Sequence, residues 1–317
     1  TWTGTRSSTI AIKNYRYISF FKCWFTEIFS QSNTLIVIHQ SKNIHVRYCL
    51  FGNILGILLK FWSNYNIHIK HTVIKNVQLH KYQTQNPYII LFLGNINIFL
   101  QNSVFTHTYG GSVIKVDQIA LIGVPTDKLV FVNVKFINNT GATVHGCLHV
   151  LKVTTVSIKG SKFNSNKAKP GHSVSVTNVV YLSIRNSIFN RNLANAEGGA
   201  IYIAKINHTI LDNVSIMYNA GSTYGSGVSA SYCNLIIVVK CNISNNKVII
   251  GSGGFVFHYC IKILFISTEV SNNHAQNYGL GVYFKGIFIL KIILCSFIKN
   301  RVFQNGAAIY AKNMSSI

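Results

Sequence analysis

The sequence of 317 residues has few acidic side chains, few prolines and no long uncharged apolar segment. Only six residues are Asp or Glu, so a site that needs several clustered carboxylates, such as a calcium site, has little material to form from. The most hydrophobic segments are residues 88–93, which are too few to span a membrane, and residues 282–294, which lysine interrupts. We therefore expect no transmembrane span. Hydrophobic residues make up 49% of the chain, which excludes a disordered protein.

Basic residues greatly outnumber the acids. A total of 29 Lys and Arg gives a formal net charge of +23. This excess favours an acidic polysaccharide or another polyanion as partner through salt-sensitive electrostatics, and no motif indicates specific recognition of nucleic acid. The alternative is compositional bias, because Lys, Asn, Ile, Phe and Tyr share A/T-rich codons. Bias accounts for many lysines but not for the scarcity of acids.

The seven cysteines do not form a metal-binding pattern. They are an odd number and show neither a CxxC pair nor the Cys and His spacing of a zinc site, so we expect no metal and no cofactor. Cys233 and Cys260 are 27 residues apart among aliphatic repeat positions, which predicts buried thiols that pack as small apolar side chains. The chain begins at Thr1 without a methionine or a signal-peptide pattern, so we expect a segment of a longer protein.

A repeat of about 27 residues runs through the second half of the sequence. An apolar anchor opens a four-residue segment that ends in Asn, as in FINN, FNSN and FNRN, and successive segments are 26 or 27 residues apart. The terminal asparagines form an unbroken column: Asn139, Asn166, Asn192, Asn219, Asn246, Asn273 and Asn300. We expect this column at a turn, where Asn tolerates left-handed backbone geometry and its amide bonds to the next coil.

Other repeat positions are apolar with the alternation of strands. Five residues before the anchors stand Phe131, Ile158, Ile184, Leu211, Val238, Phe265 and Ile292. Fifteen residues before them stand Leu148, Val174, Ile201, Val228, Phe255 and Val282, followed two residues later by a second apolar column. A column made mostly of glycine precedes that strand: Gly171, Gly198, Gly225, Gly279 and Gly306, with His145 and Ser252. The period-two pattern predicts strands with one face in a core, and glycine suits a sharp corner.

These columns predict an all-β fold, a right-handed parallel β-helix solenoid of about ten coils. Residues 41–317 are expected to form one β-helix domain, with regular 27-residue coils from about residue 130. Earlier coils have anchors near Phe51, Ile74 and Phe105. Residues 1–40 fit poorly and are expected to be an irregular cap or a partial coil.

A leucine-rich-repeat-like solenoid is the alternative. Ile184, Ser187, Phe189 and Asn192 follow the LxxLxLxxN pattern, and the period lies within the range of that family. However, Ser, Thr or Cys often stands where leucine is required. The segments GGAIYI, GSGVSA, GGFVFH and GLGVYF are also too rich in glycine and β-branched residues for a helical side, which favours the β-helix.

The pairing of GGAI at Gly198–Ile201 with FxxN at Phe136, Phe163, Phe189 and Phe297 resembles the polymorphic outer-membrane protein repeats. Those repeats belong to the wider pectin-lyase-like group of right-handed β-helices. The resemblance covers residues 130–312 well and residues 40–130 weakly. It implies an extracellular or cell-surface solenoid, and it also implies polysaccharide cleavage as an activity to test for.

The carboxylates give little support to an enzyme. Glycoside hydrolysis needs two carboxyl groups on one groove, and lyases that use calcium need several oxygen ligands. Asp117 and Asp127 lie in an irregular insertion between coils and are the weak catalytic candidates. Two turn-forming aspartates are the simpler interpretation. His145, His149 and His172 fall on neighbouring coils without further ligands, so we expect surface or turn histidines and no metal site.

One strand face resembles a binding surface. Tyr202, Tyr283 and Tyr310 point outward beside a column of His258, Lys285 and Lys312. Flat rings next to cations suit an extended acidic glycan through ring stacking and charge. The alternative is that tyrosine simply favours strand surfaces.

Three functions follow from these patterns. The first is a non-enzymatic extracellular β-helix that acts in adhesion, glycan binding or as a surface scaffold. The second is a divergent polysaccharide lyase or glycoside hydrolase with its groove near Asp117 and Asp127. The third is a fragment of a repeat protein without retained activity. The sequence names neither the ligand nor the oligomeric state.

Overall fold

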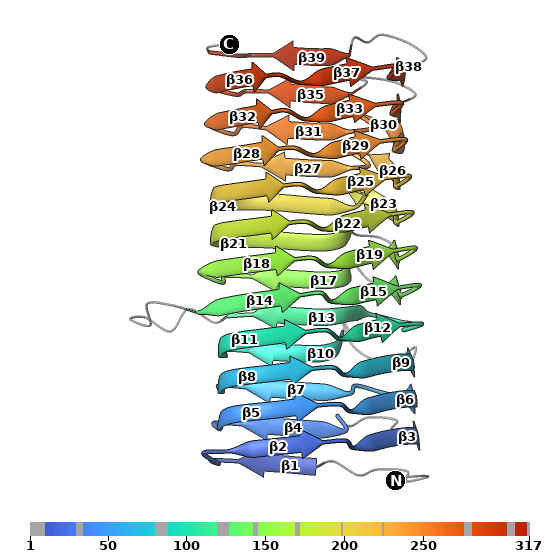
Figure 1. The fold of residues 1–317 in the computed structure, drawn as a ribbon, viewed down its shortest axis with the longest axis vertical. Helices are drawn as coiled ribbons and strands as arrows, with labels where there is room; N and C mark the ends of the chain where they lie inside the picture. The colour runs from blue at the N-terminus through green and yellow to red at the C-terminus, as the bar shows by residue number, and fades with distance from the viewer. Residues whose placement is uncertain are drawn as a thin grey trace.

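The computed structural model is all-β, and its strands stack in parallel as a right-handed β-solenoid (Figure 1). It describes residues 10–29, 34–79, 88–118, 127–141, 145–168, 172–197, 199–223, 225–275, 281–302 and 308–315. Each turn of the chain adds one layer, rising from β1 at the bottom of Figure 1 to β39 at the top. The predicted parallel β-helix is therefore confirmed.

Each complete turn visits four faces, which we name A to D. Face A contains β1 (Ile10–Lys13), β4 (Ile36–His39), β7 (Leu59–Trp62), β10 (Tyr88–Leu93), β13 (Ser112–Asp117), β17 (His145–Leu151), the first halves of β21 (His172–Arg185) and β24 (Ile201–Asp212), β27 (Val228–Ser231), β31 (Phe255–His258), β35 (Val282–Lys285) and β39 (Ile309–Lys312). Face B contains β2 (Ile18–Phe21), β5 (Lys42–Arg47), β8 (Tyr65–Lys70), β11 (Ile96–Gln101), β14 (Lys128–Val132), β18 (Thr155–Lys159), the second halves of β21 and β24, β28 (Leu235–Val239), β32 (Lys262–Ile266) and β36 (Ile289–Ile293). Because β21 and β24 run unbroken across both faces, A and B form one sheet.

The other two faces consist of shorter strands. Face C contains β3 (Trp24–Phe29), β6 (Leu50–Leu55), β9 (Val73–Gln78), β12 (Val104–Thr106), β15 (Lys135–Ile137), β19 (Lys162–Asn164), β22 (Ile188–Asn190), β25 (Ser215–Met217), β29 (Asn242–Ser244), β33 (Glu269–Ser271) and β37 (Ser296–Ile298). Face D contains β16 (Thr140–Gly141), β20 (Lys167–Ala168), β23 (Leu193–Glu197), β26 (Ala220–Thr223), β30 (Lys247–Ile250), β34 (His274–Ala275) and β38 (Arg301–Val302). Face C thus has eleven layers within the described ranges, in line with the expected ten or so coils.

The register follows the repeat of the sequence. Phe136 pairs with Phe163 and Phe163 with Phe189, one coil apart each time. The leucine-rich-repeat alternative is wrong, because the segments that it needs as a helical or looped side are strands β27, β31 and β35. Strands β1, β2 and β3, which fall within residues 1–40, also pair in parallel with the next coil. The division of the chain at residue 40 stays a prediction.

Stacked rings fill the core. Phe105, Phe136, Phe163 and Phe189 form one continuous column with neighbouring ring centroids 4.9, 4.8 and 4.7 Å apart. All four are completely buried. Parallel in-register strands place identical side chains directly above one another, so a repeated Phe builds a ladder of offset ring contacts in addition to its burial.

The corners A–B, B–C and C–D share one backbone conformation. A residue with positive φ is followed by a buried residue that points inward, as in Asn138 (φ 53°) before Asn139 and Lys240 (φ 50°) before Cys241. The turn therefore needs left-handed geometry at one position per corner, where Asn, Gly or a surface side chain stands. We expected the asparagine column itself to adopt this geometry; that was wrong, because the strained position lies one residue earlier.

The asparagine column occupies the corner between faces C and D. In Asn219 the amide nitrogen donates to Phe189 O (3.0 Å) and to Asn246 Oδ1 (2.9 Å), and the backbone N–H also donates to Asn246 Oδ1 (3.0 Å). The same bonds recur from Asn139 to Asn273, and Thr108 starts the column by donating to Asn139. Every repeated donor and acceptor is satisfied inside the stack, which allows a polar column to be buried without a large desolvation penalty.

The first coils place their polar ladder at a different corner. Between faces A and B, the backbone N–H of Ser41 donates to Asn64 Oδ1 (2.8 Å) and that of Asn64 to Asn95 Oδ1 (3.0 Å). In later coils the same corner holds Val153, Val179, Ile206, Cys233, Cys260 and Ile287, all buried. The prediction of buried thiols at Cys233 and Cys260 is confirmed, with 0% and 1% exposure.

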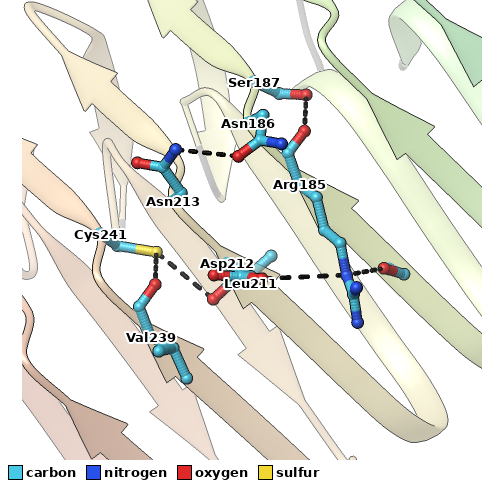
Figure 2. A network of polar contacts seen from close by, with 9 residues as sticks. Arg185, Asn186, Ser187, Leu211, Asp212, Asn213, Val239 and Cys241 are labelled. Atoms are coloured by element: carbon cyan, nitrogen blue, oxygen red, sulfur yellow. Dashed lines mark hydrogen bonds and ion pairs between the residues drawn. The ribbon is translucent and has the colours of Figure 1, made fainter.

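Hydroxyl and thiol side chains line the corner between faces B and C in most coils, and Val134 and Val214 take their place in two of them. Figure 2 shows Ser187 Oγ donating to Arg185 O (2.8 Å) and Cys241 Sγ donating to Val239 O (3.2 Å) and Leu211 O (3.4 Å). On the outside of the same corner, Asn213 Nδ2 donates to Asn186 Oδ1 (2.8 Å). Small polar side chains are used here because they satisfy corner carbonyls without widening the stack.

Candidate functional site

The candidate site lies on face A of the last three described coils, at β31, β35 and β39. His258, Lys285 and Lys312 stand directly above one another in the register, and Tyr283 pairs with Tyr310 in the adjacent outward column. Successive layers of a parallel sheet are about 4.8 Å apart, so these five side chains share one small area. The structure therefore brings together five of the six residues selected from the sequence.

The rings of this area stack on one another. Tyr283 and Tyr310 lie face to face, with centroids 5.3 Å apart and planes within 6°. His258 meets Tyr283 edge to face, with centroids 5.6 Å apart. Because one face of each tyrosine is covered by the other, a sugar cannot insert between them. The phenol edges are the parts that a ligand can reach.

Two tyrosines that the sequence analysis missed extend the area around the corner between faces A and B. Tyr232 and Tyr259 have centroids 5.5 Å apart, and Lys285 Nζ lies 5.5 Å from the Tyr259 centroid. Both tyrosines are strongly exposed. They are in the positive-φ position of the corner, which the strand alternation does not reveal. We call the combined set of Tyr232, His258, Tyr259, Tyr283, Lys285, Tyr310 and Lys312 the C-terminal aromatic surface.

The electrostatics of this surface are cationic. Burial and the positive charge of Lys285 lower the pKa of His258 below its usual value, so the imidazole is neutral near pH 7. Lys285 and Lys312 pair in register, which places two positive charges on neighbouring layers. An anionic group placed between the two layers is favoured by both ammonium groups.

Tyr202 lies apart from this surface, on β24, two layers below β31. Its ring stacks on that of His172, with centroids 4.4 Å apart and planes within 8°. His172 and His149 are 7% and 5% exposed. The expectation of surface histidines is wrong for these two residues, because this outward part of face A is covered in the middle coils. The side chain of His145 lies outside the described residues.

The two aspartates proposed as weak catalytic candidates are at opposite ends of the 119–126 segment, which lies outside the described residues. Asp127 Oδ1 accepts a hydrogen bond from the Thr154 backbone N–H of the next coil (2.8 Å), and Thr155 N donates to Asp127 O (3.1 Å). Asp117 ends β13 and pairs with Leu93 and Leu151. The contacts of Asp127 are those of a residue that ties one coil to the next.

Within the described ranges, no group of three or more His, Cys, Asp or Glu side chains is close enough together to hold a metal ion. All seven cysteines are free thiols. Within the same ranges, no helix has the length and apolarity needed to cross a membrane.

Most Lys and Arg side chains in the described ranges form no ion pair with Asp or Glu. Among the described residues, one ion pair joins Lys or Arg to Asp or Glu: Arg185 Nε lies 4.0 Å from Asp212 Oδ2, and the two side chains are 50% and 38% exposed (Figure 2). Such an exposed pair contributes little to stability. Since 29 cationic side chains face six acidic ones, most of the positive charge is balanced by solvent ions or by ligands.

Comparison with protein families and curated proteins finds no match at the level of sequence. Among solved structures, tailspike protein 3 of bacteriophage CBA120 matches with a TM-score of 0.36 and 11% sequence identity. The match covers 98% of this chain and 54% of the tailspike chain, so the chain spans about half the length of that protein. The resemblance to polymorphic outer-membrane protein repeats stays a prediction.

Proposed function

We propose that the protein is a non-enzymatic β-helix domain, extracellular or on a cell surface, that binds a polysaccharide through the C-terminal aromatic surface. One observation carries the proposal: Tyr283, Lys285, Tyr310 and Lys312 repeat in register on successive coils. A ladder of identical groups matches a ligand that is itself a linear repeat. The extracellular location is supported by the resemblance of the GGAI and FxxN segments to surface-protein repeats.

The binding mode follows from the ring geometry. The tyrosine faces are largely occupied by neighbouring rings and by Lys285, so the phenol hydroxyls act as hydrogen-bond donors and acceptors toward sugar hydroxyl groups. Lys285 and Lys312 attract carboxylate or sulfate groups of the polymer, which favours an acidic polysaccharide over a neutral one.

The test is binding of the purified chain to a panel of neutral and acidic polysaccharides at low and physiological salt, with release of reducing ends assayed in parallel. Saturable binding without product is expected, and Tyr283→Ala and Lys285→Ala should each weaken it. Tyr218→Ala is the matched control, because Tyr218 is 56% exposed on the corner between faces C and D, away from this surface.

Each other outcome points to one of the alternative functions. Product release that Asp117→Asn or Asp127→Asn abolishes would make the protein a divergent lyase or hydrolase. Binding that Tyr218→Ala weakens as much as Tyr283→Ala would show that the C-terminal aromatic surface is not the site. Neither binding nor product would leave a scaffold or a fragment without retained activity.

A further inference from the structure

A second ladder of rings lies on face B of the first four coils. His45 and His68 pair in register and stack with centroids 5.1 Å apart, and His68 stacks on Phe99 at 4.9 Å. Tyr17 covers the lower side of His45 at 5.3 Å. We call Tyr17, His45, His68 and Phe99 the histidine ladder. The coils of β13, β17, β21 and β24 separate it from the C-terminal aromatic surface (Figure 1).

Two cations flank this ladder, and neither has an acidic partner within the described ranges. Arg47 and Lys70 pair in register in the adjacent outward column of β5 and β8. Arg47 Nη2 lies 2.8 Å from His45 Nδ1, and Arg47 Nε is buried without any hydrogen-bond partner among the described residues. The strands β2, β5, β8 and β11 contain no Asp or Glu. The guanidinium as a whole is only half-buried, so an external anion can reach its Nη groups, whereas the buried Nε lies out of reach of a ligand.

We propose that face B of the first four coils is a second binding site, which takes the sulfate or carboxylate groups of an acidic polysaccharide on Arg47, Lys70, His45 and His68. Guanidinium groups bind planar or tetrahedral oxyanions through paired N–H donors. Lys70 supplies a second charge one layer away, and the outward edges of the imidazoles supply further N–H donors. The site is independent of the proposed function, because it shares no residue with the C-terminal aromatic surface.

The arrangement of the rings favours a polysaccharide over nucleic acid. Single-stranded nucleic acid binds by stacking its bases on aromatic faces. Here both faces of His68 and one face of His45 are covered by stacked rings, and Tyr17 lies tilted at 41° against the other side of His45, so no base can insert between the stacked rings. Beside the rings, Asn66 Nδ2 donates to Asn43 Oδ1 (3.1 Å) and Asn97 Nδ2 to Asn66 Oδ1 (3.0 Å). This outward amide ladder offers hydrogen bonds to sugar hydroxyl groups.

Protonation couples the ladder to the ligand. Arginine has no acceptor, so Nδ1 of His45 accepts from Arg47 and the proton of the neutral ring is on Nε2. A proton on Nδ1 breaks this bond and releases Arg47 toward solvent. The charged groups that face the two imidazoles are Arg47 on β5 and Lys70 on β8. The neighbouring layers add the uncharged Tyr17, which precedes β2, Ser19 on β2 and Phe99 on β11.

The same neighbours set the direction of the pH effect. Burial, Arg47 and Lys70 lower the pKa of His45, and burial, His45, Lys70 and Arg47 lower that of His68. Bound oxyanions oppose this by stabilising the protonated rings, so binding takes up protons. Affinity for the acidic polysaccharide therefore rises as the pH falls below the usual range of histidine.

The experiment measures binding of dextran sulfate to the purified chain at about pH 7.5 and about pH 5.5, with uncharged dextran and an oligothymidine as further probes. Dextran sulfate should bind more tightly at the lower pH, and dextran should not bind at this site. Arg47→Gln and Lys70→Gln should each weaken binding at this site about tenfold at the lower pH. Lys247→Gln removes an equal charge from face D and should change binding at most about twofold.

Further variants distinguish a local site from a general effect of charge or of misfolding. The double variant His45→Gln/His68→Gln should flatten the pH dependence, whereas Tyr283→Ala should leave it intact. Since Arg47 has a buried Nε and contacts His45, Lys70→Gln provides the charge test even if Arg47→Gln misfolds. Thermal melting checks each variant. Equal weakening by Lys247→Gln, or binding that does not change with pH, would overturn the proposal. Oligothymidine binding that Lys70→Gln weakens as strongly would replace it with a nucleic-acid site.

Discussion

The phenol ring of Tyr259 lies over Gly286 of the next coil, where an added Cβ atom would be only 2.6 Å from ring carbon Cδ1. Gly286 has a φ of +65°, so this corner requires glycine both for its backbone conformation and for the space that the ring occupies. The same ring contacts Tyr232 and faces Lys285 Nζ. Gly286, at the edge of the C-terminal aromatic surface, thus leaves the space that allows Tyr259 to take its position.

Replacing this glycine should affect stability and binding together. Gly286→Ala is expected to lower the free energy of unfolding by about 1–2 kcal/mol, through left-handed strain and displacement of Tyr259. Polysaccharide binding should weaken as the ring moves. Gly94→Ala is the control, since Gly94 has a φ of +57° but an added Cβ meets nothing nearer than 3.7 Å. Urea denaturation measures the stability of the two variants, and a titration with polysaccharide measures their binding. Equal binding by the two variants would contradict the role given to Gly286.

Replacing an asparagine in the middle of the buried asparagine column should lower the free energy of unfolding. Asn219→Ala removes the acceptor for two Asn192 donors and the donor to Phe189 O, all buried. Leaving such groups unpaired should cost about 3 kcal/mol of unfolding free energy. Asn234→Ala, which loses only an exposed bond to Asn207 Oδ1, should change stability by less than about 0.5 kcal/mol. Chemical denaturation compares the two, and similar losses would count against the ladder as a main source of stability.

The corner geometry predicts a stabilising substitution. Lys240 is exposed with a φ of 50°, a conformation that costs an L-residue about 1 kcal/mol or more. Lys240→Gly should therefore raise the melting temperature, while Lys240→Val should lower it because a branched side chain resists this conformation further. Differential scanning calorimetry of both variants measures the two shifts. A lower melting temperature for the glycine variant would show that the corner is not strained.

The thiols should differ in reactivity according to burial. Burial raises the pKa of Cys49, and it raises that of Cys241 to about 11, so both are largely protonated at neutral pH. Cys23 and Cys295 are partly exposed. Iodoacetamide should label Cys23 and Cys295 in the folded protein and the other five only after unfolding. Mass spectrometry of digested samples reports each position, and rapid labelling of Cys241 would disagree with the packing described above.

Stability should fall on mild acidification. The pKa values of His45, His68 and His258 are lowered in the folded chain, mainly by burial. Between their folded pKa values and the unfolded value of about 6.5, the unfolded chain binds more protons, so the free energy of unfolding decreases as the pH drops through that window and levels off below it. Denaturation at a series of pH values measures this. His45→Gln/His68→Gln should reduce the slope, and an unchanged slope would assign it to other groups.

The fold was predictable from the sequence because parallel stacking converts a chemical repeat into a spatial column. Asn192 and Asn219 are 27 residues apart, and the structure bonds them directly. The ladder of Ser41, Asn64 and Asn95 was missed because its spacings are 23 and 31 residues, so loops of unequal length hide the period. The orientation of the rings could not be predicted from the pattern either. Spacing places Tyr283 beside Tyr310, but the structure is needed to show that each ring covers a face of the other.

The asparagine ladder has a consequence for how such a chain changes length. Each member bonds only to its immediate neighbours, and Asn192, Asn219 and Asn246 make the same set of contacts. Removing residues 193–219 would bring Asn246 to the place of Asn219 and leave every column in register. A whole coil can therefore be inserted or deleted as one unit. Unequal recombination between repeats would lengthen or shorten the distance between the two ends of the solenoid while the asparagine ladder stays continuous.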